Sequence, residues 1–356
     1  MEVINIDLKD RSYPIYICNN MLDDIGKVVC RHTKSKRIYL VTDTNVYPLY
    51  YEKVKAILNN AGFDVSKFVI PAGESSKNLD MLKNILEDIY KSGLLRDGSI
   101  IALGGGVVGD IAGFAAATYM RGVDFIQIPT TLLAQVDSSV GGKVGVNLRG
   151  GKNIVGAFHQ PKMVYIDTSN LRTLNKREIL GGLAEIIKYG VIWDKELFEY
   201  LEYNMDEILN LNDEMITHII KKSCVIKGKV VSLDEKEQKL RQILNYGHTV
   251  GHAIEALTGY EKYIHGEAVA IGMVYAAKLS LKKSLIDKEY FDRICALIKK
   301  SGLPVEYGEL HKEDIVELIR HDKKNKNDKI RFVLPVGYGK VDIFEVNKDE
   351  ILSILD

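Results

Sequence analysis

Residues 99–110 read SIIALGGGVVGD, an apolar run that leads directly into a glycine-rich turn. The run 99–103 has the length and composition of a buried strand, and a helical pattern follows the glycines. Gly104, Gly106 and Gly109 match the GxGxxG spacing, which brings backbone N–H groups and a helix N-terminus to a pyrophosphate. No clear acidic residue ends a second strand about 20 residues later, so the match alone is weak. The strand before the turn and the helix after it favour a dinucleotide phosphate site over a tight turn without a ligand.

The first half of the chain alternates short β-rich runs with helical patterns. The β-rich runs occupy residues 37–42, 65–70, 99–103 and 164–167. The helical patterns lie near residues 49–61, 78–91 and 107–120. This order implies parallel strands joined by crossover helices. It predicts an α/β fold that begins with a Rossmann-like, parallel-sheet nucleotide-binding domain over residues 1–175.

The second half is dominated by long amphipathic patterns. They cover residues 177–189, 197–209, 214–231, 243–257, 267–283 and 288–301, and a β-rich run follows at 330–335. Helical periodicity of this length predicts a mostly α-helical domain over residues 176–356. His248, His252 and His265 fall within it, so it would be the metal-binding domain. A chain of 356 residues is long enough for two cores, which would also offer a cleft.

Composition and charge are those of an ordinary globular protein. Hydrophobic residues make up 46% and charged residues 27% of the chain, and 48 basic residues balance 48 acidic ones. The neutral balance gives no support for nucleic-acid or membrane binding, and no run is apolar enough to span a bilayer. The N-terminus lacks the features of a secretory signal, and the four scattered cysteines form no CxxC pair. We therefore expect a cytoplasmic protein with reduced thiols.

Residues 244–255, LNYGHTVGHAIE, carry the strongest indication of a metal site. On a helix, His248 and His252 lie one turn apart on the same face, so both imidazoles could bind one ion. His265 and a carboxylate from elsewhere would complete a zinc site that keeps one position open. The spacing alone is weak evidence, because either histidine could be an ordinary helix residue.

Three further segments carry polar groups whose role the residues alone leave open. Glu185 and Lys188 share a helical face and could form an ion pair, or Glu185 could supply the carboxylate of the metal site. Residues 129–143 are rich in glycine and hydroxyl groups and include Asp137 and Lys143, which could line a cofactor or substrate site. The Lys-rich run 321–326 has the composition of a solvated loop, but its place before an apolar strand keeps a binding role open.

Together these motifs resemble the 3-dehydroquinate synthase family. The segments that carry the likeness occur in the family's order and spacing over nearly the whole chain, at residues 104–110, 129–143, 182–188, 245–255 and 265–267. The resemblance implies a lyase of the shikimate pathway, and so of chorismate and aromatic amino-acid biosynthesis. Its substrate would be 3-deoxy-D-arabino-heptulosonate 7-phosphate and its products 3-dehydroquinate and phosphate. The implied course is transient oxidation by NAD+ at C5, phosphate elimination, reduction and intramolecular aldol closure, in a homodimer.

The resemblance also assigns the metal ligands. It implies a divalent metal held by Glu185, His248 and His265, with Zn2+ as the first expectation and Co2+ as an alternative. The sequence leaves the native metal open among Zn2+, Co2+ and Fe2+. His252 then falls outside the ligand set and becomes a substrate-side histidine close enough for proton transfer, whereas spacing alone would have made it a ligand.

Positions for NAD+ and for the anionic substrate follow from the same resemblance. The NAD+ positions are Asp43, Asn45, Ala72, Gly73, Glu74, Ser75, Ser76, Lys77, Gly106, Val107, Val108, Gly109, Asp110, Thr130, Thr131, Lys143, Lys152, Asn170, Leu171, Arg172 and Thr173. The substrate positions are Asp137, Lys152, Asn153, Lys188, Lys227, Arg241, Asn245, His252, either Lys323 or Lys324, and Arg121 from a neighbouring subunit. Those expected to take part in catalysis are Asp137, Lys143, Lys188, Lys227, Arg241, Asn245 and His252. Arg241 and Asn245 are expected one turn apart on the helix that carries His248.

Two other activities would share these motifs. Another sugar phosphate cyclase would use the same fold, metal and NAD+, but Lys227, Arg241 and the pair Lys323–Lys324 favour a substrate that bears a carboxylate. A metal-dependent polyol dehydrogenase would release NADH and would not need so many cations. The synthase reaction is therefore the expected one.

Overall fold

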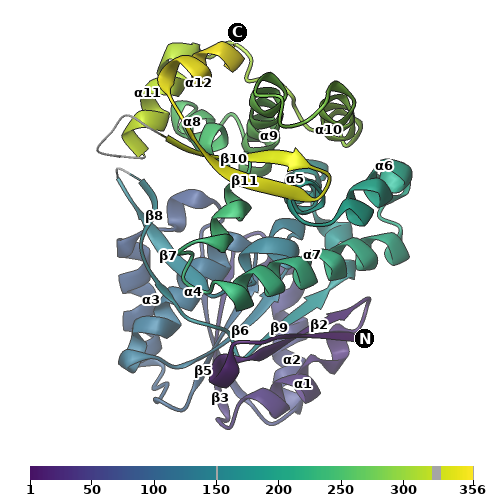
Figure 1. Ribbon diagram of the computed structural model, residues 1–356. Coiled ribbons are helices and arrows are strands. Elements are labelled where there is room, and N and C mark those ends of the chain that lie inside the picture. Colours follow the sequence, from purple (N-terminus) through teal and green to yellow (C-terminus); the bar gives the residue numbers. More distant parts are fainter. Residues whose placement is uncertain (150, 323–329, 356) are drawn as a thin grey trace. The chain divides into compact units, whose positions relative to one another are not determined.

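The computed structural model describes residues 1–149, 151–322 and 330–355 (Figure 1). These residues form two compact units, the first of Met1–Leu174 with Ile216–Lys236 and the second of Asn175–Met215 with Glu237–Asp356. The chain first passes between the units at Asn175, where the sequence analysis places the domain boundary. Residues 216–236, expected in the second domain, pack with the first unit. Lys323 and Lys324 lie outside the described residues.

A seven-stranded sheet forms the centre of the first unit. Its strands are β1 (Glu2–Ile6), β2 (Tyr13–Cys18), β3 (Arg37–Asp43), β4 (Asp64–Ile70), β5 (Ser99–Gly104), β6 (Asp124–Pro129) and β9 (Met163–Asp167). Their order across the sheet is β1-β2-β9-β6-β5-β3-β4. β1 pairs with β2 in the antiparallel sense, and every other neighbouring pair is parallel. The parallel-sheet α/β character predicted for this half is confirmed.

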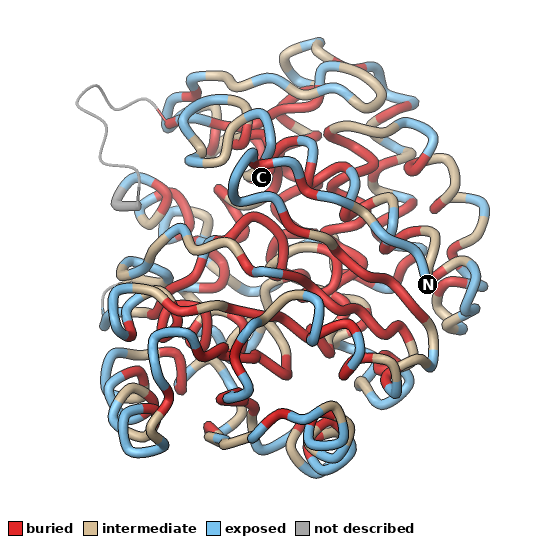
Figure 2. The backbone as a smooth tube through the Cα atoms, turned by 90° about the horizontal axis from the view of Figure 1, so that it is seen from below, coloured by how far each residue is buried: buried red, intermediate tan, exposed pale blue. Residues whose placement is uncertain are grey.

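Helices cover both faces of this sheet. On one face, α1 (Ile25–His32) and α2 (Glu52–Asn60) bury Val29, Val54 and Leu58 against the strands. On the other face, α3 (Leu79–Lys91) and α4 (Gly106–Thr118) bury residues such as Ile85 and Ile111. Buried residues therefore run along the inner strands, while exposed residues gather on the outer sides of helices and in loops (Figure 2). Burial on both faces explains why the strands read as continuous apolar runs.

The strand order changes direction between β3 and β5. From β3 the chain crosses to β4 on one side, and from β5 it crosses to β6 on the other. In open parallel sheets, ligands bind in the crevice outside the carboxyl ends of the strands at such a point. The segments that leave these two strands begin at Asp43 and Gly104.

Two further elements complete the first unit. The hairpin of β7 (Lys143–Leu148) and β8 (Gly151–Phe158) packs on α4, and the sequence analysis did not anticipate it. A Cβ on Gly156 would lie 2.3 Å from the Val144 carbonyl oxygen, so this hairpin needs glycine where its strands approach closely. Helix α7 (Asp213–Leu233) packs here mainly through residues after Met215, and its Cys224 thiol donates to the Gln135 carbonyl at 3.3 Å.

The second unit is mostly helical, as predicted. Its helices are α5 (Lys176–Ile192), α6 (Lys195–Leu209), α8 (His248–Leu257), α9 (His265–Lys282), α10 (Lys288–Lys300), α11 (Lys312–Asp322) and α12 (Lys348–Leu355). A hairpin of β10 (Ile330–Gly337) and β11 (Lys340–Val346) joins them. Helix α9 is buried around most of its circumference, which makes it the central helix of this unit.

One predicted helix is broken in the structure. Instead of a continuous helix over 243–257, a 3-10 helix covers Leu240–Asn245 and α8 begins only at His248. Gly247 between them has φ of 81°, in the left-handed region that glycine adopts without strain. Buried Tyr246 donates its hydroxyl to the Met273 carbonyl at 2.9 Å, which fixes this break. The expectation that Arg241 and Asn245 share the helix of His248 was therefore wrong.

In the described part of the chain, no helix combines the length and the apolar character that crossing a membrane requires.

Candidate active site

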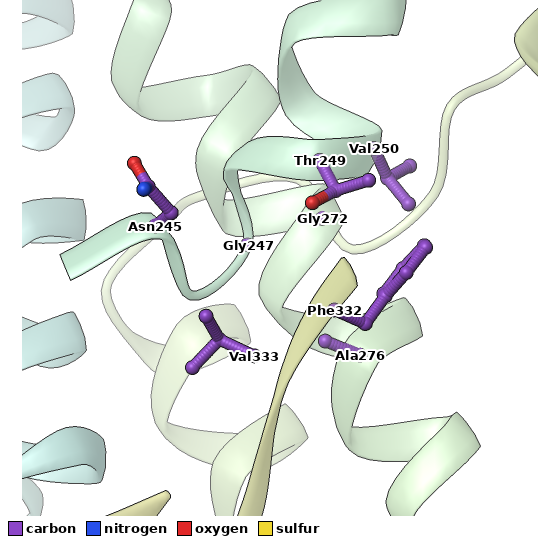
Figure 3. Close-up of a pocket in the computed structure, with 8 residues that line it drawn as sticks. All are labelled: Asn245, Gly247, Thr249, Val250, Gly272, Ala276, Phe332 and Val333. Carbon is purple, nitrogen blue, oxygen red and sulfur yellow. The ribbon is translucent and has the colours of Figure 1, made fainter. Parts of the chain in front are cut away.

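Three helices of the second unit touch backbone to backbone at glycines. A Cβ on Gly266 in α9 would lie 2.1 Å from the Gly181 carbonyl oxygen in α5. A Cβ on Gly272 in α9 would lie 1.9 Å from the carbonyl oxygen of Gly247, just before α8. Both distances are shorter than any side chain tolerates, so these helix approaches require glycine. Figure 3 shows Gly247 and Gly272 at the second crossing.

A small hollow, too narrow to admit a water molecule, lies beside this crossing (Figure 3). Its lining residues come from α8, α9, β10 and the segment before α8, and they are Asn245, Gly247, Thr249, Val250, Gly272, Ala276, Phe332 and Val333. None of these residues is charged, and Asn245 and Thr249 supply the only polar side chains among them. The hollow therefore lacks the cations that an anionic substrate would need.

The glycine contacts bring three potential metal ligands together. Glu185 follows Gly181 by one turn of α5, and His248 and His265 are the first residues of α8 and α9. The Glu185 Oε1 atom lies 3.6 Å from His248 Nε2 and 3.4 Å from His265 Nε2. One ligand atom from each residue lies within 4.8 Å of the others. Two imidazole nitrogens and one carboxylate oxygen form the donor set of a catalytic zinc site with an open position.

Glu185 is fully buried and uses its two oxygens differently. Oε1 faces the two histidines, while Oε2 is in direct contact with the Lys188 ammonium group one turn along α5. Glu185 therefore forms the intrahelical ion pair with Lys188, and its other oxygen faces the two histidines. A buried carboxylate needs such partners to offset its lost hydration.

The electrostatics of the cluster leave His248 neutral. Burial and the nearby charge of Lys188 lower the pKa of His248 to about 3. Its Nδ1 lies 3.0 Å from the Tyr246 carbonyl oxygen, which can only accept, so Nδ1 carries the proton and donates it. The Nε2 lone pair consequently faces Glu185, in the form that a metal requires.

His265 behaves in the opposite way. Burial lowers its pKa, but hydrogen bonds to Glu185 and Glu255 outweigh that effect and raise it to about 10. The two histidines differ because His248 adjoins Lys188, whereas His265 lies between two carboxylates. A cation bound among Glu185, His248 and His265 would replace the proton that His265 otherwise holds.

His252 lies beside this cluster and is exposed to solvent. Its ring centroid is 5.3 Å from that of His248 and 6.2 Å from that of His265. It forms a second possible donor set with Glu255 and His265, and it does not belong to the set that contains Glu185. Sequence reasoning gave Glu255 no role, although its position two turns after His248 places it on the same helical face.

The glycine-rich turn of the first unit lies at the carboxyl end of β5 and packs closely on the segment that follows β6. A Cβ on Gly105 would lie 2.9 Å from Thr131 Cγ2, and one on Gly106 would lie 3.2 Å from Ser138 Oγ. Helix α4 begins at Gly106 without a side-chain cap, so its first N–H groups are available to an anion. This arrangement fits the pyrophosphate of a dinucleotide.

In the part of the chain that the structure describes, two buried polar groups near the carboxyl ends of the strands have no hydrogen-bond partner. Among the described residues, the Thr130 hydroxyl and the Asn170 amide nitrogen are buried without a hydrogen-bond partner. Such groups normally find a partner, so they fit a site that a ligand completes. Asp43 instead accepts the backbone N–H groups of Asn45 at 2.8 Å and Val46 at 2.9 Å, which shapes the loop after β3.

Several other predicted NAD+ positions form side-chain contacts within the first unit. The Lys77 ammonium group, which is 5% exposed, contacts the Asp110 carboxylate, and burial raises the pKa of Asp110. Glu74 accepts a hydrogen bond from the Asn147 amide at 2.7 Å. These pairs lie within the first unit and tie the loop after β4 to α4 and β7.

The predicted substrate positions divide between the two units. In the first, Lys227 of α7 binds Asp137 through both its carboxylate Oδ1, at 2.8 Å, and its backbone carbonyl, at 2.6 Å. In the second, Arg241 is 2% exposed, and the Asn245 amide donates to Glu237 Oε1 at 3.1 Å. The remaining positions of the first unit are exposed or half-buried, namely Arg121, Lys143, Lys152 and Asn153.

Comparison with known proteins decides the family. Family models described as 3-dehydroquinate synthase N-terminal and C-terminal match residues 67–181 and 182–325. A 3-dehydroquinate synthase of Thermoanaerobacter sp. (strain X514) is 66% identical over 355 residues, covering 100% of both chains. The chain belongs to the 3-dehydroquinate synthase family. Identity at this level supports the phosphate-eliminating lyase activity of that family, in the shikimate pathway, and does not favour the two rival activities.

Solved structures of related cyclases share the fold of this dehydroquinate synthase family member. A 2-deoxy-scyllo-inosose synthase complexed with carbaglucose-6-phosphate, NAD+ and Co2+ is 28% identical, with a TM-score of 0.89 over 99% of both chains. A 2-epi-5-epi-valiolone synthase from Streptomyces hygroscopicus subsp. jinggangensis 5008, with NAD+ and Zn2+ bound, is 27% identical, with a TM-score of 0.90 over 98% of this chain and 97% of that one. The two-domain fold of the sequence analysis therefore matches that of sugar phosphate cyclases.

Proposed function

We propose that the chain converts 3-deoxy-D-arabino-heptulosonate 7-phosphate into 3-dehydroquinate and phosphate, with NAD+ as a cofactor that is regenerated in each turnover. The observation that carries the proposal is the cluster of buried Glu185 with half-buried His248 and His265 in a member of the dehydroquinate synthase family. The first unit would serve as the NAD+-binding domain and the second as the metal-binding domain.

Both cofactors fit residues of this chain. For NAD+, the open start of α4 would hold the pyrophosphate, and the buried groups of Thr130 and Asn170 would gain hydrogen-bond partners. For a divalent cation, Glu185, His248 and His265 would be the ligands, with Zn2+ as the first choice and Co2+ as the alternative. When bound, NAD+ would accept and return a hydride, and the cation would polarise a substrate hydroxyl.

The charged side chains of the second unit would bind the substrate's anionic groups. Arg241 is deeply buried, and its guanidinium keeps its charge at any accessible pH, so it suits a carboxylate or a phosphate. Lys188 would neutralise Glu185 and orient it toward the histidines. His252 is exposed beside the cluster and could therefore transfer a proton at the substrate.

The first unit would supply further residues for substrate binding and catalysis. They are the ion pair Lys227–Asp137, Lys143, Lys152 and Asn153. In the pair, Asp137 fixes the direction of the Lys227 ammonium group through two oxygens, which prepares that cation for a phosphate. The protein would be a cytoplasmic homodimer in which Arg121 reaches the substrate of the neighbouring subunit. One of Lys323 and Lys324 would also contact the substrate.

A coupled assay tests this function. Purified protein would be given Zn2+, a catalytic amount of NAD+ and 3-deoxy-D-arabino-heptulosonate 7-phosphate, and phosphate, dehydroquinate and NADH absorbance would be followed together. Equal amounts of phosphate and dehydroquinate without accumulating NADH are expected. No turnover of this substrate, together with NADH formed from simple polyols, would move the chain to the dehydrogenase class.

A further inference from the structure

Glu255 is a buried carboxylate that the proposed reaction does not use. It lies in the last part of α8 and is 1% exposed. Its Oε2 atom lies 3.3 Å from His265 Nδ1, within hydrogen-bonding distance. A carboxylate is costly to bury unless it has a polar partner, so its position beside His265 requires a physical reason.

His265 lies between two carboxylates on opposite sides of its ring. Its Nε2 faces Glu185 Oε1 at 3.4 Å, and its Nδ1 faces Glu255 Oε2 at 3.3 Å. A neutral imidazole carries one proton and one lone pair. If Nδ1 keeps the proton and donates it to Glu255, the lone pair on Nε2 faces the candidate metal position.

His248 shows the same arrangement with a different acceptor. Its Nδ1 donates to the Tyr246 carbonyl, which leaves Nε2 directed at Glu185. Both candidate ligand histidines therefore have an acceptor behind Nδ1, a backbone carbonyl for His248 and a carboxylate for His265. Histidines that bind metals commonly donate their second nitrogen in this way, which fixes the tautomer and raises ligand basicity.

We propose that Glu255 is a positioning residue that holds His265 in the Nε2-binding tautomer. The inference rests on the proposed metal site. Glu255 acts through His265 and does not touch the metal or the substrate. Because its acceptor is charged while that of His248 is neutral, Glu255 makes His265 the more basic of the two histidine ligands.

A different use of the same residues is a second cation site of His252, Glu255 and His265. That site would need the Nδ1 lone pair of His265, the atom that donates to Glu255 in the positioning arrangement. One nitrogen cannot both donate a proton and bind a metal, so the two arrangements make opposite predictions. The positioning role allows one tightly bound ion per chain, and the second site would allow two.

Metal affinity of the metal-free full-length protein tests the inference without reference to turnover. Zn2+ would be titrated in competition with a chromophoric chelator into wild-type protein, Glu255→Ala and Glu255→Gln. Removing such an acceptor typically weakens metal binding by about 10- to 100-fold, which is the loss expected for Glu255→Ala. Glu255→Gln keeps an oxygen that can accept from Nδ1 and should lose clearly less. Glu261→Ala, at an exposed glutamate after α8, is the matched control and should bind Zn2+ as wild type does.

Two further readouts separate positioning from a merely structural role. Circular dichroism and thermal unfolding of the metal-free variants would identify a fold that has collapsed, and the Glu255→Gln variant has nearly the volume of the natural residue. The visible spectrum of Co2+-loaded protein should shift in Glu255→Ala and return toward wild type in Glu255→Gln.

The outcomes are distinct. Folded Glu255→Ala that binds Zn2+ with wild-type affinity would overturn the inference, as would two Zn2+ per wild-type chain with one lost in both His252→Ala and Glu255→Ala. Failure of wild-type protein to bind Zn2+ at all would instead overturn the metal site of the proposed function.

Discussion

Two regions of this molecule depend on glycine for different reasons. At the turn between β5 and α4, Gly105 and Gly106 pack against the side chains of Thr131 and Ser138, and α4 begins there without a side-chain cap for its first N–H groups. At the helix crossings of the second unit, Gly266 and Gly272 let the helix backbones touch. A side chain at either position would collide with the neighbouring backbone. The first region offers backbone donors to an anion, and the second brings ionisable side chains together in one cluster.

The difference shows how each region produces chemistry. A backbone donor site needs only a local turn and a helix start, so it can form within one strand–turn–helix segment. The cluster of Glu185, His248 and His265 draws one residue from each of three helices, so its geometry depends on how closely those helices approach. We expect the second region to be the more sensitive of the two to added volume.

Removing the metal should break the second region and leave the first intact. Treatment with a strong chelator should lower turnover at least about 1000-fold, because a bound cation contributes several kcal/mol to stabilising developing charge. NAD+ affinity, measured by equilibrium titration of the same sample, should stay within about twofold of the untreated protein. Readdition of Zn2+ should restore turnover, and parallel loss of NAD+ binding would show that the two regions are not separate.

Among substitutions that add a single methyl group, Gly272→Ala should lower stability the most. Its Cβ would lie 1.9 Å from the Gly247 carbonyl oxygen, so α8 and α9 must separate. The free energy of unfolding should fall by about 3 kcal/mol, at the upper end of overpacking costs, and Zn2+ affinity should fall with it. Chemical denaturation measures the first effect and chelator competition the second. Gly337→Ala in β10 is the control, because a Cβ there meets nothing within 4 Å.

The sequence predicted the features that depend on neighbouring residues, and it did not predict those that depend on packing between distant segments. The strands, the glycine-rich turn at Gly104–Gly106 and most helix bounds follow from patterns within about 15 residues, and the structure has them. The break at Gly247 arises from the packing of Tyr246 on α9, and the β7–β8 hairpin from glycines that allow close strand pairing. Neither signal is visible in local periodicity.

In the candidate site, too, the local motif was predictable and the contacts between separate segments were not. The motif around His248 and His265 indicated metal ligands, but spacing alone would have made His252 a ligand as well. The contact of Glu255 with His265 joins residues ten positions apart across a loop, and periodicity cannot predict such an approach. Resemblance supplied the choice of Glu185, and the structure supplies the distances that support it.

Gly106→Ala should affect the first region in a milder way. Its Cβ would lie 3.2 Å from the Ser138 hydroxyl, a tight contact that a small side-chain movement relieves. The added methyl group would mainly obstruct the open start of α4, so NAD+ affinity should fall about 10-fold, equivalent to about 1.4 kcal/mol. Zn2+ affinity should be unchanged. A variant that loses Zn2+ and retains NAD+ binding would contradict the assignment of the two regions.

Arg177→Gln should have the smallest effect, and it tests whether the start of α9 is held by packing or by charge. Arg177 binds both oxygens of Glu267, at 2.8 and 2.7 Å, and Glu267 also accepts the Ile264 N–H at 3.0 Å, just before His265. The Arg177 side chain is 48% exposed, so solvent screens the pair and its loss should cost less than about 1 kcal/mol of unfolding free energy. If the Gly181–Gly266 contact fixes His265, as we argue, Zn2+ affinity should change by less than about threefold. A loss in Zn2+ affinity as large as that of Gly272→Ala would mean that a surface ion pair, and not the helix contact, sets the position of His265.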